Sequence, residues 1–290
     1  MDGGFSFCVR FSGLVLRFSL PTGLALPDCF AALRCEDTTP DVEYRVSLLT
    51  TPLSPDTEPV YKQGDATIYP TEKGWLRIYS ALTAADGCQV ACLLRSDGKN
   101  ILYYPASRWE HYSEFWHCTH LLAGEAMLLN QNAFLLHSSL VMVEGKTILF
   151  SGPSGAGKST QANLWAEFAG AEILNGDRTV IMKKEDGFYG GGSLWSGTSG
   201  IYRPEQAPIA GIILIKKGPR EQIRRLGFEA FVPLFSQTTL NSWDPDFMSK
   251  VSELYAELLA QVPVYELECR PCAEAVALTY KTLFGKEMPL

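Results

Sequence analysis

The segment that decides the fold of this chain is Ser151-Gly152-Pro153-Ser154-Gly155-Ala156-Gly157-Lys158-Ser159-Thr160. Between Gly152 and Ser159 it fills every fixed position of the phosphate-binding pattern G-x-x-x-x-G-K-[ST]. The run Lys146-Thr147-Ile148-Leu149-Phe150, rich in β-forming and apolar residues, predicts a strand that enters the loop. Apolar residues between 162 and 169 recur at helical spacing and predict a helix that leaves it. Strand, glycine loop and helix in this order are the setting that the pattern requires.

The chemistry of such a loop follows from its residue types. Glycines let successive backbone N–H groups point at phosphate oxygens, and the helix N-terminus adds positive potential. Lys158 is expected to meet the β- and γ-phosphates, and the Ser159 hydroxyl to ligate Mg²⁺. The sequence therefore predicts that ATP and Mg²⁺ bind to Gly152, Ser154, Gly155, Ala156, Gly157, Lys158, Ser159 and Thr160.

Composition excludes several classes of function. The chain has 290 residues, of which 46% are hydrophobic and 20% charged, values typical of a globular protein with one or two cores. A net charge of −7 without a basic cluster gives no support to nucleic-acid binding. Residues 1–6 lack the features of a signal peptide, and no apolar run has the length of a membrane span. We therefore expect a cytoplasmic protein with no membrane partner.

The N-terminal region, residues 1–131, is predicted to be β-rich and to end in a connecting helix over 107–129. Alternating apolar residues, separated by turn pairs such as Asp97-Gly98, predict its strands at 5–11, 14–16, 44–49, 66–69, 75–79, 89–94 and 100–104. The helix would carry His111, His117 and His120. They could share a metal, but a surface or interface position is the favoured interpretation. This region is expected to select the acceptor or to contribute contacts of a homo-oligomer.

The second region, residues 132–290, is predicted to be an α/β domain around the loop. Its expected strands are 134–141, 146–150, 171–174, 179–182, 211–215 and 265–269, and its later helices follow Asp244-Pro245 and span 273–283. The glycines at 190–192 are interpreted as a flexible segment. Cys269 and Cys272 have the spacing of a metal or redox pair, yet no second pair accompanies them, so packed cysteines are favoured.

A phosphate-binding loop needs an acidic partner, and Asp177 is the candidate. It follows the apolar residues 173–174, directly after the loop helix, where a parallel crossover brings strand ends beside the phosphates. The strand 211–215 ends in two lysines and cannot supply this group. Asp177 would ligate the metal or accept the proton of an attacking hydroxyl. The alternative is an aspartate with no role beyond its turn.

The order of His137, hairpin, loop, helix and Asp177 resembles the catalytic domain of HPr kinase/phosphorylase and the related phosphoenolpyruvate carboxykinase-like fold, over roughly residues 137–215. The resemblance implies that His137 lies near the transferred phosphate, either bonding it or tuning Asp177. Where that family has an acidic pair, this chain has Gly176-Asp177, and the residues before Asn132 differ from the family's N-terminal domain. Both departures argue against the protein HPr as substrate and against the reverse phosphorylase reaction.

Three further features complete the expected site. Residues 192–198 mix small and hydroxyl side chains and resemble a loop that closes on a substrate. Arg203 could offset charge on the phosphoryl oxygens, and Arg178 is equally consistent with a structural position.

The leading hypothesis is a Mg-dependent kinase that moves the γ-phosphoryl group of ATP to a hydroxyl acceptor, a serine-like small molecule, a peptide or a protein, with Asp177, His137 and Lys158 as its catalytic residues. The alternatives are a nucleotide-dependent ATPase or switch and a non-catalytic nucleotide-binding module.

Overall fold

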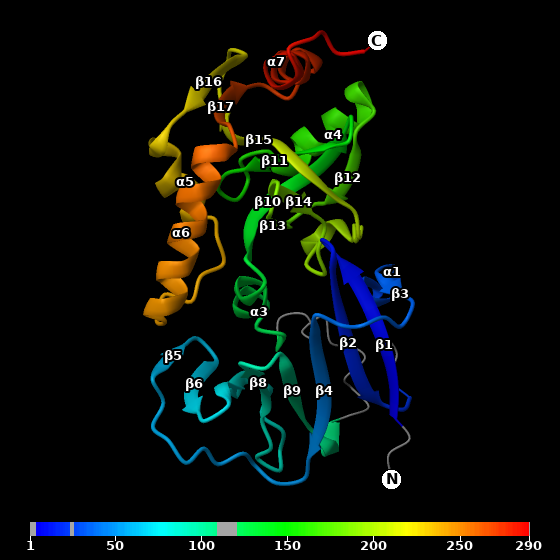
Figure 1. The fold of residues 1–290 in the computed structure, drawn as a ribbon, viewed down its shortest axis with the longest axis vertical. Helices are drawn as coiled ribbons and strands as arrows, with labels where there is room; N and C mark the ends of the chain where they lie inside the picture. Colours follow the sequence, from blue (N-terminus) through cyan, green and yellow to red (C-terminus); the bar gives the residue numbers. More distant parts are fainter. Residues whose placement is uncertain (1–3, 24–25, 109–120, 290) are drawn as a thin grey trace. The chain divides into compact units, whose positions relative to one another are not determined.

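The computed structural model describes residues 4–23, 26–108 and 121–289 (Figure 1). The chain divides into two compact units. The first extends to Met127, and the second runs from Leu128 onward and includes the short turn Phe11–Gly13. The second unit thus begins a few residues before the boundary at 131 that the sequence suggested.

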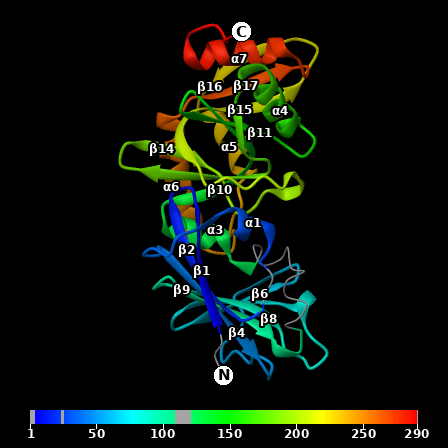
Figure 2. The same ribbon diagram turned by 90° about the vertical axis from the view of Figure 1, so that its right-hand side faces the viewer.

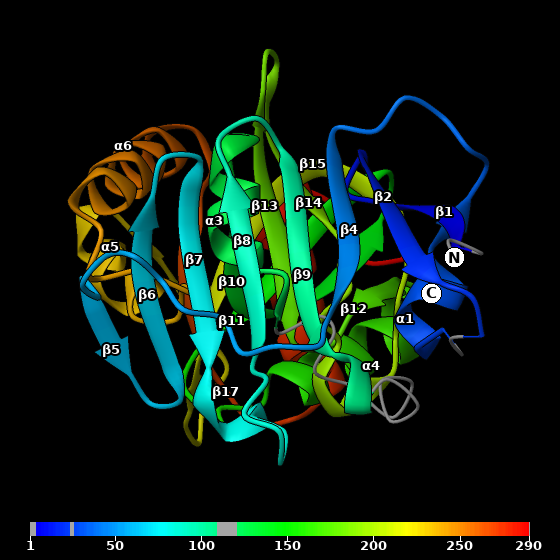
Figure 3. The same ribbon diagram turned by 90° about the horizontal axis from the view of Figure 1, so that it is seen from below.

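The first unit is built on a nine-stranded sheet in the order β3-β1-β2-β4-β9-β8-β7-β6-β5, which Figure 3 shows along its width. The pairs β2–β4 and β4–β9 are parallel, and β5 to β9 pair antiparallel. Its strands are β1 (Gly4–Phe11), β2 (Leu14–Pro21), β3 (Arg34–Cys35), β4 (Val42–Leu49), β5 (Tyr61–Gln63), β6 (Ala66–Thr71), β7 (Gly74–Tyr79), β8 (Val90–Arg95) and β9 (Lys99–Pro105).

All seven strands expected from the alternating pattern are confirmed, because each buries its apolar face. Phe18 lies at the centre of that face, with its ring stacked on Phe7 at 5.5 Å and on Tyr44 at 5.3 Å. Phe30 completes the cluster from the short helix α1 (Asp28–Ala32), which the sequence did not predict. The strands β3 and β5 were also missed, since two or three residues are too few to show a period.

The predicted helix over 107–129 is interrupted in its described part. Leu121 is helical and α3 spans Gly124–Asn130, but Ala123 between them has a φ of +48°, which a continuous helix does not allow. His111, His117 and His120 lie outside the described residues.

The second unit contains a mixed eight-stranded sheet in the order β11-β10-β13-β14-β15-β17-β16, with β12 paired to β10 and β11 also paired to β15. The pairs β11–β15 and β15–β17 are parallel, while β10 is antiparallel to each of its partners. Its strands are β10 (Ala133–Val143), β11 (Lys146–Ser151), β12 (Glu172–Asn175), β13 (Arg178–Lys184), β14 (Gly187–Gly191), β15 (Gln206–Lys217), β16 (Gln222–Leu226) and β17 (Val264–Cys269). This is the mixed α/β architecture that the sequence predicted.

Strand β10 has different neighbours on its two sides. On one side its residues 133–137 pair with β13 and its residues 140–142 with β12, and on the other side its residues 138–143 pair with β11. The turn between β12 and β13 therefore lies opposite residues 138–139, where the pairing with β11 begins. Since β11 and β12 lie on either side of β10 and both run antiparallel to it, their carboxyl ends point the same way.

Helices cover this unit in two groups (Figure 2). The helices α4 (Lys158–Ala169) and α7 (Ala273–Phe284) pack on one core, where the Trp165 ring stacks on Tyr280 at 5.9 Å. The helices α5 (Phe231–Phe235) and α6 (Pro245–Gln261) pack on a second core, where Tyr255 contacts Phe134 at 4.7 Å. None of the helices in the described ranges is both long enough and apolar enough to cross a membrane.

The prediction of a flexible glycine segment is wrong for Gly190 and Gly191, which belong to strand β14. A Cβ atom at Gly190 would lie 2.7 Å from the Thr147 hydroxyl and 3.2 Å from a Leu140 methyl group. Glycine is therefore needed because β14 lies close to its neighbours, and not because the backbone is flexible. The strand β16 and the helix α5 were not predicted either.

The predicted start of helix α6 gives the first test. The Asp244 carboxylate accepts hydrogen bonds from the backbone N–H groups of Asp246 and Phe247, with Pro245 at the first helical position. We expect Asp244→Ala to lower the free energy of unfolding by about 1 kcal/mol, because it leaves these donors unpaired. Asp246→Ala removes the same charge without removing the cap, and should lower the free energy of unfolding by only a few tenths of that amount. Equal losses of stability in urea titrations of the two variants would contradict the capping role.

Candidate active site

Strand β11 delivers the glycine loop to the edge of the sheet, and helix α4 begins at its end. Gly155 and Gly157 have φ of +76° and +111°, backbone values that residues with a side chain rarely adopt. Gly157 is the N-cap of α4, and no side chain accepts a hydrogen bond there. The first backbone N–H groups of α4 therefore retain their hydrogen-bonding capacity, as an anion site requires.

Asp177 is fixed by the turn that follows β12. The Asn175 side chain is fully buried, and its Oδ1 accepts from the N–H groups of Asp177 at 2.9 Å and Arg178 at 2.8 Å. The Ser138 N–H donates to the Asp177 carbonyl at 3.0 Å and ties the turn to β10. Sequence reasoning did not assign a role to Asn175. An asparagine two residues before the candidate acid was the available signal, since asparagine side chains close such turns.

His137 pairs with Arg178 at the start of β13, directly after Asp177, and this register brings it to Asp177. Its Nε2 is 3.3 Å from Asp177 Oδ1, and Arg178 Nε is 3.6 Å from the other carboxylate oxygen. The hydrogen bond from His137 lowers the pKa of Asp177, and the Arg178 and Lys158 charges act in the same direction, while burial opposes them. Asp177 is thus held as a carboxylate.

Lys158 lies inside the loop and is buried. Its Nζ donates to the carbonyl oxygens of Gly152 at 3.0 Å and Pro153 at 3.2 Å. Burial lowers its pKa, and the Asp177 charge acts against that shift.

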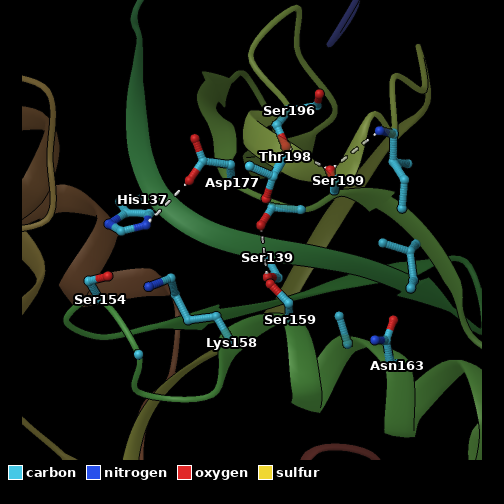
Figure 4. A pocket seen from close by; sticks show the side chains of 15 residues that line it. His137, Ser139, Ser154, Lys158, Ser159, Asn163, Asp177, Ser196, Thr198 and Ser199 are labelled. Carbon is cyan, nitrogen blue, oxygen red and sulfur yellow. Dashed lines mark hydrogen bonds and ion pairs between the residues drawn. The ribbon is translucent and has the colours of Figure 1, made fainter.

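A cavity of about 470 Å³ joins these groups (Figure 4). His137 and Asp177 face Lys158, Ser154 and Ser159 across it. Of the predicted site residues, the cavity is lined by His137, Ser154, Gly155, Lys158, Ser159 and Asp177. Gly152, Ala156, Gly157 and Thr160 are not among its lining residues, and neither is Arg203, which pairs with Glu172 at 3.5 Å.

The cavity has oxygen ligands of the kind that Mg²⁺ prefers. The Ser159 hydroxyl and the Asp177 carboxylate both line it. Mg²⁺ is usually bound through one or two protein carboxylates and the phosphates of its substrate, so one aspartate is enough. Within the described ranges no three His, Cys, Asp or Glu side chains are grouped to hold a metal ion on their own.

The two cysteines with metal-like spacing are packed side chains. Cys269 is buried, its sulfur accepts a hydrogen bond from Gln161 Nε2 at 3.3 Å, and burial raises its pKa to about 11. Burial also raises the pKa of Cys272. Neither thiol is ionised at neutral pH, as the interpretation of packed cysteines requires.

The segment that follows β14 is anchored to the Asp177 turn. Ser193 is buried, and its hydroxyl donates to the Arg178 carbonyl at 2.6 Å and lies 3.2 Å from Asn175 Nδ2. Beyond this anchor, Ser196, Thr198 and Ser199 line the cavity. The segment predicted to lie on the substrate side therefore forms one wall of the cavity.

Gly176 directly precedes Asp177 and packs against the segment that follows β14. A Cβ atom there would lie 2.5 Å from both the Cβ and the hydroxyl of Ser199. Glycine is required because these two backbone segments lie against each other, so the single carboxylate is built into this site.

Comparisons with known proteins give little. The chain matches no known protein family, and no curated protein is similar to it in sequence. Among solved structures, the HPr(Ser) kinase/phosphatase from Coxiella burnetii aligns with a TM-score of 0.29 and 13% identity, over 51% of this chain and 87% of that one. A likeness at this level assigns neither an activity nor a substrate.

The contact at Gly176 gives the second test. We expect Gly176→Ala to lower the free energy of unfolding by about 1–3 kcal/mol, because the added methyl group overlaps Ser199. Adding Ser199→Gly opens that space and should recover most of the loss in a double-mutant cycle. Additive effects of the two substitutions would show that the packing at this position is not what selects glycine.

Proposed function

We propose that this protein is an ATP-dependent, Mg-dependent kinase that transfers the γ-phosphoryl group to a hydroxyl acceptor. The observation that supports it is the His137–Asp177 pair at 3.3 Å, placed across one cavity from Lys158 and Ser159. A glycine loop alone would fit any nucleotide-binding protein. A carboxylate held ionised beside it gives the hydroxyl group of an acceptor a place to leave its proton.

The proposed reaction uses few groups of the protein. The backbone N–H groups of the loop and the Lys158 ammonium bind the β- and γ-phosphates and stabilise the charge that develops during transfer. Ser159 would hold Mg²⁺ directly and Asp177 would hold it through a water molecule, and the bound ion would neutralise phosphate charge. The acceptor oxygen bonds to the γ-phosphorus while the bond from phosphorus to the β–γ bridging oxygen breaks. The hydroxyl proton passes to the Asp177 carboxylate, and ADP leaves.

His137 has a positioning role in this scheme. It donates a hydrogen bond to one carboxylate oxygen of Asp177 and leaves the other oxygen, which faces Arg178, as the acceptor of the proton. The bond holds Asp177 in its ionised form, in which it can act as a base.

Turnover assays separate the kinase from the alternative functions. ADP release that depends on an added hydroxyl compound supports a kinase, release without an acceptor indicates an ATPase or switch, and ATP binding without release indicates a non-catalytic module. Lys158→Ala should weaken ATP binding and abolish turnover in a folded protein. Lys146→Ala, at the exposed start of β11, is the matched control.

Asp177→Asn tests the proposed base. The amide is nearly isosteric, so ATP should still bind, while turnover should fall by a factor on the order of 10² or more because the proton acceptor is lost. Asp186→Asn changes an aspartate outside the cavity and should leave turnover unchanged. Turnover close to that of the wild type in Asp177→Asn would reduce Asp177 to a turn residue.

The pH dependence tests the pair. Because His137 lowers the pKa of Asp177, the carboxylate stays ionised, and the stability that its ion pairing contributes persists, until the pH falls through that lowered pKa. His137→Ala should raise the pKa, so the acidic limb of the kcat/KM profile moves to higher pH. Arg178→Ala should move it less, since its charge contributes less to the shift. An unmoved acidic limb in His137→Ala would show that Asp177 does not control the rate.

A further inference from the structure

The wall of the cavity beside Asp177 carries information about the acceptor. A Cβ atom at Gly197 would lie 2.9 Å from the Asp177 carboxyl carbon, and Ser199 packs on Gly176 next to it. The segment 196–199 is therefore the immediate neighbour of the proposed base. An acceptor that brings a hydroxyl group to Asp177 must contact this segment.

The wall that the acceptor would meet consists of this segment and of lining residues from β10, α4, β12 and the adjoining turns, and its chemistry is uniform. Apart from the glycine loop, His137 and Asp177, every residue that lines the cavity is uncharged. These nine residues are Ser139, Ala162, Asn163, Ile173, Gly176, Ser196, Thr198, Ser199 and Ile201. The nearby arginines have other contacts, since Arg203 pairs with Glu172 and Arg178 with Asp177 and Thr239.

Two polar groups of the wall are available to a ligand. The Thr198 and Asn163 side chains are exposed, and neither forms a hydrogen bond with another described residue. The Ser139 and Ser199 hydroxyls instead donate to the carbonyls of Gly176 and Ser196. Figure 4 shows Thr198 beside Asp177, and Asn163 on helix α4 beyond Ser159.

From this wall we infer that the acceptor is a small uncharged polyhydroxy compound, a polyol or a sugar. One hydroxyl would reach Asp177, and the others would bond to Thr198 and Asn163. A carboxylate or phosphate on the acceptor would lie against side chains that carry no positive charge, so it would gain no ion pair there. This inference rests on the proposed kinase function and names the class of its substrate.

A panel of acceptors with the purified full chain, ATP and Mg²⁺ tests the inference. The panel contains glycerol, a five-carbon polyol, a hexose, free serine, glycerate and serine blocked at both ends. ADP release that depends on the polyols or the sugar supports the inference. Faster release with free serine or glycerate overturns it, as does faster release with the blocked serine, which would point to a peptide. These two results leave the kinase function standing, whereas no release with any acceptor contradicts both.

A variant identifies the wall as the acceptor site. Thr198→Val keeps the side-chain volume and removes the hydroxyl, so the KM for the acceptor should rise about tenfold while the KM for ATP stays unchanged, the effect of one lost hydrogen bond. Thr198→Ser restores the hydroxyl and should recover the KM. A rise in the KM for ATP instead would place the nucleoside on this wall and overturn the inference.

Discussion

The site depends on one constraint, the register of strand β10 with β12 and β13. His137 pairs with Arg178 in β13 and Leu140 pairs with Asn175 in β12, so the turn that carries Asp177 lies opposite Ser138 and Ser139. The Ser138 N–H donates to the Asp177 carbonyl and holds this turn in place. On its other side β10 pairs with β11 from Ser138 onward, which places the start of the glycine loop next to the same residues. A shift of this register would separate His137 from Asp177.

The two hydrophobic cores of the second unit support, from opposite sides, the edge of the sheet that carries the site. Trp165 and Tyr280 are fully buried on the side of α4 and α7, and Tyr255 is fully buried on the side of α5 and α6. Strand β11, which leads into the glycine loop, contributes buried residues to both, with Phe150 in one core and Leu149 in the other. The glycine loop is therefore fastened to a strand that is packed on both faces, which is the rigid support that a phosphate site needs.

Much of this arrangement could be predicted because it rests on local patterns. The glycine loop, its flanking strand and helix, and the Asp244 cap of α6 are each set by residues close together in sequence. The requirement for Gly190 in β14 depends instead on close neighbours from other strands, Thr147 and Leu140. A glycine required by a close approach and a glycine in a flexible loop look alike in a sequence. Only the packing distinguishes them.

The contact between His137 and Asp177 could not be predicted from the sequence either. Their order along the chain suggested a site, but the 3.3 Å contact between them depends on how β10 and β12 register. The interruption of the connecting helix predicted over 107–129 was missed for a different reason. The apolar spacing of this helix carries no signal for the left-handed Ala123 that separates α3 from the preceding residues.

The contact between Gly176 and Ser199 also constrains how this site can change over time. A second carboxylate at position 176 has no room while Ser199 keeps its side chain. The substitution at 199 would therefore have to come first in any lineage that gains or regains an acidic pair. The effect of the acid depends on the residue already present at a distant position in the sequence. In evolutionary terms the two positions are epistatic, and the order of their substitutions decides which chemistry this fold can reach.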